Sequence, residues 1–354
     1  MRILLTPLVV LVASMILWAQ DSQNLHKEIS KIIRYDTEIS FDKTPGFLIG
    51  VIDGDSTYFL RFGAFTDSLP EGKFFLGGAS KTVAAALVQT LVEKGTLRYE
   101  QRIAALFPDC NFPDDITIRD LLSHQTNFHK TPTNLGKHQS DPRNPYGDYG
   151  TDELQTYICD LHSTRKADFQ YSHVNYALLE LILERVTGSP FDTLLSSFSE
   201  ELGLPVLVNS REQADLNMVN GHDRSCFEAS PWTFASFSAS EGICSDIETM
   251  VDFVQWHLKT KRFDNLLIKQ TETPYDPKIF VGLSWHIFDY RRYPFYSHSG
   301  KAGGHYAFMG FAKATDTGVV ILANSSVGTE DLGILVLRMI NKNWKRKPIP
   351  LKNG

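Results

Sequence analysis

Runs of apolar residues with few charged positions predict the strands of this chain. Two runs rich in β-forming residues, Phe47–Asp53 and Ser56–Gly63, stand on either side of Gly54. A short polar turn between two such runs is typical of a β-hairpin. Three later runs have the same character and predict further strands: Gly282–Phe288, Tyr306–Ala312 and Gly318–Ala323.

Helical patterns fill much of the remaining chain. Residues Thr82–Lys94 are apolar nearly all round a helix, which predicts a buried helix, and Gly95 follows it in the position of a C-cap. Helical, loop-rich sequence dominates from about Thr117 to Ala229. Further helices are predicted at Tyr176–Val186, at Ser245–Leu258 and from about Asp331 to Asn343.

The order of these elements predicts an α+β fold. Strands at both ends with helices between them indicate an α+β domain that is split by a helical insertion. We expect the α+β domain at residues 21–116 and 235–345 and the insertion at 117–234, with an N-terminal segment at 1–20 and a tail at 346–354. The polar loop Asn127–Gly150 is long enough to be a lid or specificity loop, and a disordered surface loop is an equal alternative.

Composition and charge indicate a globular protein and favour no nucleic-acid partner. The 354 residues contain 42% hydrophobic and 21% charged residues, which are values of an ordinary globular protein rather than a disordered or fibrous one. The net charge is −6, and the one dense basic stretch, Lys342–Lys347, lies at the C-terminus. A solvated terminus explains it better than a nucleic-acid site, so no nucleic-acid partner is expected.

The N-terminus predicts export. Arg2 precedes an apolar run, Ile3–Trp18, and Ala19 is a small residue suited to cleavage, a pattern typical of a secretory signal peptide. The run is shorter than the roughly 20 residues that a spanning helix needs, although an uncleaved anchor remains the alternative. We therefore expect a periplasmic or extracellular protein with no membrane span after cleavage.

The cysteines and histidines indicate no metal site. The four cysteines are spaced unlike any zinc motif, and the eleven histidines show no ligand spacing with Cys, Asp or Glu. An oxidising compartment permits disulfides, but a core of this size does not require them, so buried free thiols are expected. No metal and no cofactor are predicted.

Six short segments, in this order and spacing, carry the candidate chemistry: Pro45–Gly46, Phe75–Lys81, Thr117–His124, Tyr171–Tyr176, Gly282–Trp285 and His298–Gly300. Together they resemble the serine β-lactamase and penicillin-binding protein superfamily. The likeness is greatest to its branch of class C β-lactamases, D-alanyl-D-alanine carboxypeptidases and esterases, and it spans about Thr44–Ala323. The resemblance implies a β-lactamase/transpeptidase-like fold, with an antiparallel sheet flanked by helices, and a serine hydrolase site.

The resemblance also assigns catalytic positions. In this family a serine on the first turn of a helix attacks a carbonyl, and a lysine three residues later takes its proton. Lys81 matches the lysine, so the nucleophile position falls on Gly78, which carries no nucleophilic side chain. Tyr171 matches the tyrosine that shares the general-base work, with a pKa lowered by neighbouring cations. His298 matches the first residue of the family's third motif, usually Lys-Thr-Gly and here His298–Gly300. In that position it would orient the tyrosine or meet a substrate carboxylate.

Further positions are predicted to contact substrate. His173 stands where the family usually has Asn, which can donate a hydrogen bond to a substrate amide and accept one from it. A neutral histidine can do both through its two ring nitrogens, but at a different distance from the backbone. Ser299 and Gly300 complete the third motif, and Lys301 follows it. The oxyanion hole would consist of the backbone N–H groups of Gly78 and Lys301, and such donors survive a change of side chain.

No other serine fits the nucleophile position. Ser80 directly precedes Lys81, and adjacent helical side chains point about 100° apart, so Ser80 is expected to have a supporting role. Two literal Ser-x-x-Lys strings, Ser40–Lys43 and Ser163–Lys166, precede no buried helix and are interpreted as chance matches. Arg119 and His124 match family positions that we interpret as structural.

Three functions remain open. The chain is a non-catalytic relative that binds a small-molecule, peptide or peptidoglycan-like ligand; or it is a hydrolase in which Lys81 and Tyr171 activate water beside Gly78; or it is a Ser→Gly variant of an active enzyme. In each case the pocket is expected between the helical insertion and the α+β domain, because Lys81 and His298 come from one and Tyr171 from the other.

Overall fold

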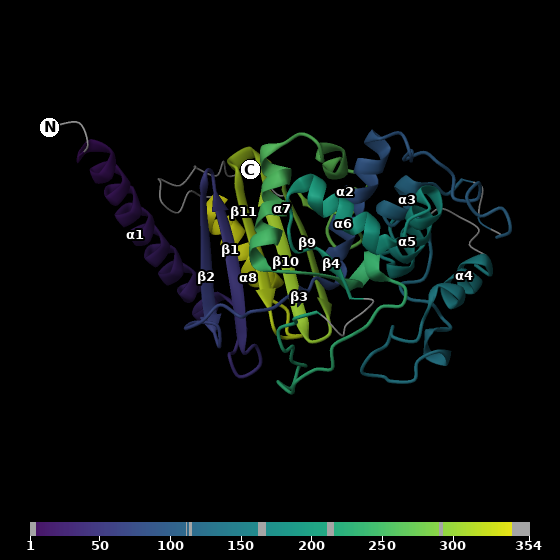
Figure 1. Ribbon diagram of the computed structural model, residues 1–354, viewed down its shortest axis with the longest axis horizontal. Helices are drawn as coiled ribbons and strands as arrows, with labels where there is room; N and C mark the ends of the chain where they lie inside the picture. Colours follow the sequence, from purple (N-terminus) through teal and green to yellow (C-terminus); the bar gives the residue numbers. More distant parts are fainter. Residues whose placement is uncertain are drawn as a thin grey trace.

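The described part of the chain comprises residues 5–110, 112, 115–161, 168–210, 216–289 and 293–341, in a computed structural model that gives side chains from residue 20 onward. Figure 1 shows a sheet with helices on both faces, and a helical region on the side away from the N-terminus. The predicted tail, its basic stretch and the Ser163–Lys166 string lie outside the described residues.

An eight-stranded sheet has the order β2-β1-β11-β10-β9-β8-β7-β6. All its neighbouring strands pair antiparallel, and β1 pairs with β11 from Phe47–Ala323 to Asp53–Thr317, which joins the N-terminal hairpin to the C-terminal strands. The strands are β1 (Gly46–Asp53), β2 (Ser56–Gly63), β6 (Thr271–Glu272), β7 (Ile279–Val281), β8 (His286–Phe288), β9 (Phe295–Ala302), β10 (His305–Ala312) and β11 (Thr317–Ala323). The predicted hairpin and the last two predicted strands are confirmed.

Both faces of the sheet are buried. Alternate residues of β11 belong to two cores: Val320 and Leu322 face one, and Val319 and Ile321 face the other. Helix α7 (Ile247–Lys259) covers the first face, and α8 (Glu330–Asn341) with the C-terminal half of α1 (Leu5–Asp36) covers the second. A strand buried on both faces is a nearly continuous apolar run, which is why β11 was predicted from its sequence.

The remaining helices form the region that faces the first core. They are α2 (Ser80–Glu93), α3 (Ile118–Leu122), α4 (Thr151–Cys159), α5 (His173–Thr187) and α6 (Phe191–Leu202). Helix α2 is buried from Ser80 to Leu91, as predicted. Helix α5 begins three residues before the predicted start, because the Ser172 hydroxyl caps it, and it ends where Gly188 adopts a φ of 69°.

The elements differ from the sequence expectations in three places: one predicted strand is wrong, one strand was not predicted, and the helix predicted at Ser245–Leu258 starts two residues later, as α7. The segment Gly282–Phe288 is not one strand: Gly282 N donates to Trp285 O at 2.8 Å, and this turn separates β7 from β8. Strand β9, which contains His298, was not predicted because its Ser-His-Ser-Gly centre has little apolar alternation. Ser245 ends a short strand, β5 (Ile243–Ser245), which pairs with β3 (Phe74–Phe75) and β4 (Val208–Asn209).

The expectation of four free thiols is also wrong. Cys110 and Cys159 form a disulfide that joins the loop after Phe107 to the end of α4, and their Cα atoms are 4.2 Å apart. Because 49 residues separate them, the sequence spacing gives no sign of the pairing. Cys244 is buried and free, and Cys226 is half-buried and free.

The N-terminal segment is helical from Leu5 as part of α1. Across the described residues, no helix combines the length and the apolar character needed to cross a membrane. The predicted domain boundaries, including the cleavage position, stay predictions.

The disulfide predicts a thiol count. Denatured, unreduced protein should react with two equivalents of a thiol reagent, and reduced protein with four, because only Cys226 and Cys244 are free. Intact mass after alkylation measures both numbers. Four reactive thiols before reduction, in protein purified from an oxidising compartment, would contradict the disulfide.

Candidate active site

Gly78 lies in a 3-10 turn, η1 (Gly77–Ala79), that leads directly into α2. Strand β9 runs against this turn so closely that a Cβ on Gly300 would lie 2.1 Å from Gly78 N. Gly77 has a φ of +52°, and a Cβ there would lie 2.3 Å from Lys301 N. Only glycine fits at 77 and 300. The backbone N–H groups of Gly78 and Lys301, which were predicted as oxyanion donors, therefore lie at one contact between η1 and β9.

The side-chain direction at position 78 points at the tyrosine. A Cβ on Gly78 would lie 3.0 Å from Tyr171 Oη and 3.1 Å from the Ser299 carbonyl oxygen. These contacts are tight, so a larger residue at 78 requires Tyr171 Oη and the Ser299 carbonyl oxygen to shift by a few tenths of an ångström. The fold thus brings Gly78 and Tyr171 together although they come from different elements.

Lys81 is completely buried, and its ammonium group has three polar neighbours. Nζ donates to Glu241 Oε1 at 2.7 Å and to the Ser240 carbonyl oxygen at 2.9 Å, and it lies 3.1 Å from His173 Nδ1. Glu241 and Ser240 belong to η4 (Ser238–Gly242), a single π-helical turn. The polar pocket expected around a buried lysine is present, and a carboxylate is part of it.

Glu241 is the residue of this cluster that sequence reasoning missed. Its side chain is 6% exposed, and it also accepts a hydrogen bond from His173 Nδ1. Burial alone would raise the pKa of Glu241, but attraction to His173 and Lys81 lowers it to about 2. The only signal in the sequence was the need of a buried lysine for a counter-charge, which does not single out one of 41 acidic residues.

Tyr171 and His298 form a second pair. His298 Nδ1 donates to the Ser284 carbonyl oxygen at 2.7 Å, so its Nε2 is the acceptor nitrogen, and Tyr171 Oη lies 3.5 Å from it. Burial lowers the pKa of His298 well below its ordinary value, so the ring is neutral. The tyrosine therefore faces His298 as a hydroxyl donor.

The expected lowering of the tyrosine pKa is wrong. Burial raises the pKa of Tyr171 well above its ordinary value, and the negative charge of Glu241 raises it further. The Lys81 ammonium lies 5.2 Å from the centre of the tyrosine ring, but Glu241 offsets its charge. Tyr171 is protonated at neutral pH.

His173 is part of the cluster around Lys81 and Glu241. Its Nδ1 is bonded to Glu241 and also lies 3.4 Å from Ser240 Oγ. Burial lowers the pKa of His173, although Glu241 opposes this shift. A contact between His173 and a substrate amide would therefore fall to the other ring nitrogen, and that contact stays a prediction.

The residues of the third motif point in different directions. Ser299 pairs across the sheet with Phe308 of the second core, and its hydroxyl interacts with Glu330 and Tyr306, away from Lys81. Lys301 is exposed and lines a cavity of about 400 Å³ with Arg224 and Trp232. The structure therefore gathers Gly78, Lys81, Tyr171, His173, His298 and Gly300, whereas the side chains of Ser299 and Lys301 lie outside this group.

The supporting residues have structural contacts. Ser80 Oγ accepts from Ile243 N at 3.2 Å, in agreement with a supporting role. His124 Nδ1 accepts from Ser172 N at 3.1 Å, and its ring lies 4.5 Å from that of Tyr171, so it helps to fix the tyrosine. Arg119 is ion-paired with Glu100 at 2.5 Å near the surface.

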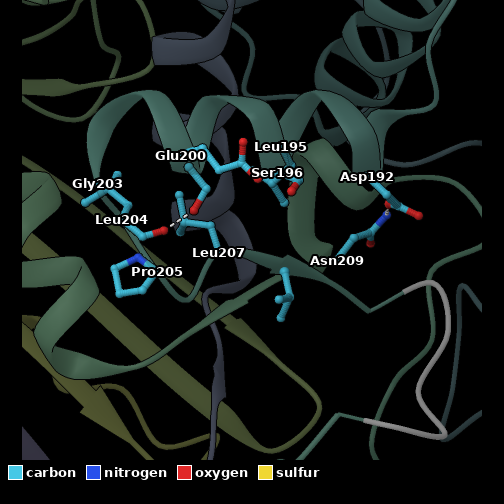
Figure 2. A pocket seen from close by; sticks show the side chains of 11 residues that line it. Asp192, Leu195, Ser196, Glu200, Gly203, Leu204, Pro205, Leu207 and Asn209 are labelled. Carbon is cyan, nitrogen blue, oxygen red and sulfur yellow. Dashed lines mark hydrogen bonds between the residues drawn. The ribbon is translucent and has the colours of Figure 1, made fainter.

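A larger cavity, of about 590 Å³, lies elsewhere. Figure 2 shows that it is lined by one side of α6 and by the segment leading to β4, and that Asn209 and Asp192 are hydrogen-bonded at its edge. None of its lining residues belongs to the cluster around Lys81. In the described part of the chain, no group of three or more His, Cys, Asp or Glu residues is placed to hold a metal ion.

Comparisons with known proteins agree with this architecture. The sequence profile of the Beta-lactamase family matches residues 36–336. Penicillin-binding protein 4 of Amycolatopsis lactamdurans is 24% identical over 334 residues, which cover 84% of this chain and 85% of that protein. A class C β-lactamase from Rhodobacter sphaeroides has a TM-score of 0.72 at 18% identity, with 90% of this chain and 99% of that chain covered.

A second solved structure is similar to the same extent. The β-lactamase/D-alanine carboxypeptidase from Pseudomonas syringae has a TM-score of 0.74 at 16% identity, and the match covers 90% of this chain and 98% of that one. Likeness at such low identity establishes the fold, an antiparallel sheet flanked by helices, as the sequence predicted.

The buried pair predicts a large, pH-dependent effect on stability. Lys81→Met should cost about 3–5 kcal/mol in the free energy of unfolding, because it leaves the Glu241 carboxylate without its cation. Replacing both residues, in Lys81→Met/Glu241→Leu, should recover most of that loss. The folded-state pKa of Glu241, about 2, lies below its ordinary 4.5. Its contribution is therefore present above pH 4.5 and should be lost as the pH falls toward 2.

Denaturant unfolding of the wild type and Glu241→Gln at several pH values measures this contribution. The exposed pair of Lys259 and Asp316, 2.6 Å apart, is the matched control, and Lys259→Met should cost about 0–1 kcal/mol. Equal costs at the two pairs, or a Glu241→Gln effect that is unchanged between pH 6 and pH 2, would contradict the ion pair.

Proposed function

Because the chain belongs to the Beta-lactamase family, we propose that it is a β-lactamase-related scaffold that binds a peptide or acyl ligand without forming a covalent acyl-enzyme. The observation that carries this proposal is Gly78. It stands three residues before the buried Lys81, and its side-chain direction points at the Tyr171 hydroxyl. A serine in this position would have both candidate bases beside it, whereas glycine offers no nucleophile.

Neighbouring hydroxyl groups do not replace the missing one. Ser80 is fully buried, and its hydroxyl is bonded to the backbone of β5. Ser240 is also fully buried, and its hydroxyl lies beside the His173 nitrogen that Glu241 occupies. A covalent route through either residue would require the pocket to rearrange.

The state of the two candidate bases counts against water activation by Lys81 and Tyr171. An efficient general base needs a vacant lone pair and a pKa near the working pH. Burial lowers the pKa of Lys81, but its ammonium group is held in an ion pair with Glu241 that opposes proton loss. The pKa of Tyr171 is raised well above its ordinary value. Binding is therefore the function that the cluster favours.

Exposed cations near the third motif support a ligand with an anionic group. Lys301 and Arg224 line the cavity of about 400 Å³ together with Asp223, whose carboxylate accepts hydrogen bonds from Ser225 N and Phe227 N. Neither cation has an ion-pair partner among the described residues. The pKa of Lys301 is lowered by partial burial and by repulsion from Arg224 and Lys130. An anion would relieve this repulsion. The relatives include a penicillin-binding protein and a D-alanine carboxypeptidase, which supports a peptidoglycan-like peptide with a free carboxylate.

Export belongs to the same proposal. The signal-like start of the chain and the disulfide between Cys110 and Cys159 both support a location outside the cytoplasm, because disulfides persist in oxidising compartments.

The absence of a nucleophile predicts that the unmodified chain forms no acyl adduct. Incubation with a fluorescent penicillin, or with a fluorophosphonate, should leave its intact mass unchanged. A related active serine carboxypeptidase treated in parallel is the positive control. A stoichiometric adduct on the Gly78 protein would refute the proposal.

The exposed cations predict how the ligand binds. A peptide ending in D-alanyl-D-alanine should bind Lys301→Glu about tenfold more weakly than it binds the wild type, because a charged contact contributes about 1.5 kcal/mol. The same peptide with an amidated C-terminus should bind both proteins alike. Lys27→Glu, which changes an exposed lysine on α1, is the charge-matched control. Calorimetric titration measures the affinities, and equal binding of the free-acid peptide to Lys301→Glu and Lys27→Glu would contradict the subsite.

A further inference from the structure

Glu241 is the one carboxylate in direct contact with Lys81 among the described residues. The two side chains meet at 2.7 Å with exposed fractions of 0% and 6%, so water does not screen them. The second contact of Lys81, the Ser240 carbonyl oxygen at 2.9 Å, also accepts a hydrogen bond from the ammonium group. A protonated lysine donates to both acceptors, whereas a neutral amine would keep both contacts only by using its two N–H bonds for them and directing its lone pair elsewhere.

Glu241 acts on the tyrosine as well. After burial, the charge of Glu241 is the largest influence that raises the pKa of Tyr171. The Lys81 cation, which would favour a phenolate, is already compensated by Glu241 at short range. One carboxylate therefore opposes proton loss from both groups.

We propose that Glu241 is a charge-setting residue that holds Lys81 and Tyr171 in their protonated forms, so that a serine restored at position 78 would still not be activated at neutral pH. This inference rests on the proposed function, because it takes position 78 as the nucleophile position. The site then differs from an acyl-transfer site in two independent ways: it has no hydroxyl at 78, and it has no proton acceptor beside it.

The chemistry of the restored serine shows why the second difference matters. For acylation, the hydroxyl oxygen of a serine at position 78 forms a bond to the substrate carbonyl carbon while its proton passes to a lone pair on Lys81 or Tyr171. That proton then goes to the leaving nitrogen or oxygen as its bond to the carbonyl carbon breaks. An ammonium ion has no lone pair to accept the first proton. Burial lowers the pKa of Lys81 even beside Glu241, which opposes this shift. Removal of the Glu241 charge would therefore lower the pKa further and favour the neutral amine, which can accept the proton.

In the described part of the chain, no other group near Lys81 or Tyr171 would replace the negative charge of Glu241. The groups that face Lys81 or Tyr171, or act on them at longer range, are histidines, tyrosines and one lysine: His124, Lys130, Tyr146, His173, Tyr176, Tyr275 and His298. None of them is an anion at neutral pH. A change at Glu241 alone should therefore alter the charge state of the site.

Four variants test the proposal: Gly78→Ser, Gly78→Ser/Glu241→Gln, Gly78→Ser/Glu241→Asp and Glu241→Gln. Their folding is checked by circular dichroism, and acylation by a fluorescent penicillin is followed by intact mass from pH 6 to pH 10. Gly78→Ser should react slowly at pH 7 and faster as the pH rises. Gly78→Ser/Glu241→Gln should react at least about tenfold faster at pH 7, with its pH–rate midpoint lower by about one unit or more, because one pKa unit changes the deprotonated fraction tenfold. The Asp variant keeps the charge and should remain slow, and Glu241→Gln with Gly78 should not react.

The remaining outcomes decide between the inference and the proposed function. If Gly78→Ser reacts at pH 7 as fast as the double variant with Gln, or if neither reacts at any pH, Glu241 does not set the charge of the bases. If the double variant does not fold, a flat pH profile for Gly78→Ser overturns the inference and an alkaline rise supports it. An adduct on the protein with Gly78 refutes the proposed function instead, since that reaction needs no restored serine.

Discussion

A lysine ammonium in the interior of a protein must find acceptors for its protons, and this constraint organises the centre of the molecule. Lys81 enters from α2, which is buried along most of its length. Its partners come from η4 and α5, so the pair ties together elements that are distant in sequence. The π-helical turn of η4 presents the Ser240 carbonyl oxygen and the Glu241 carboxylate in the same direction. That turn is itself held by α5, because Glu180 accepts a hydrogen bond from Ala239 N at 2.8 Å.

Elements with a regular apolar pattern could be predicted from the sequence. Elements that depend on close backbone approach or on contacts between remote segments could not. The β1–β2 hairpin, β10, β11 and the buried α2 follow from local periodicity. Strand β9 does not, since its glycine and polar residues are dictated by the approach of η1 rather than by burial of apolar side chains. The disulfide and the turn at Gly282–Trp285 depend on contacts between remote segments, for which a single sequence carries no signal.

The candidate site shows the same division. Spacing from Lys81 was enough to indicate Gly78, and family motifs indicated Tyr171 and His298, which the fold brings near each other. The charge state of the site could not be predicted, because it depends on Glu241, which belongs to none of the motifs. Burial of Tyr171, reinforced by this unrecognised carboxylate, reversed the expected direction of the tyrosine pKa. Residue identity at motif positions thus defines where a site is, whereas the surrounding charges define what protons it can move.

The disulfide between Cys110 and Cys159 links the loop before α3 to α4 in the helical region. It closes a loop of 49 residues, and in the chain-entropy account such a closure disfavours the unfolded state by about 4 kcal/mol. That increment is absent while the thiols are reduced. A newly synthesised chain would therefore hold its helical region weakly until oxidation, and would be easier to unfold for translocation or to degrade. Under the export proposed above, the bond would form only outside the reducing compartment, and the more stable form of the helical region would be reached there.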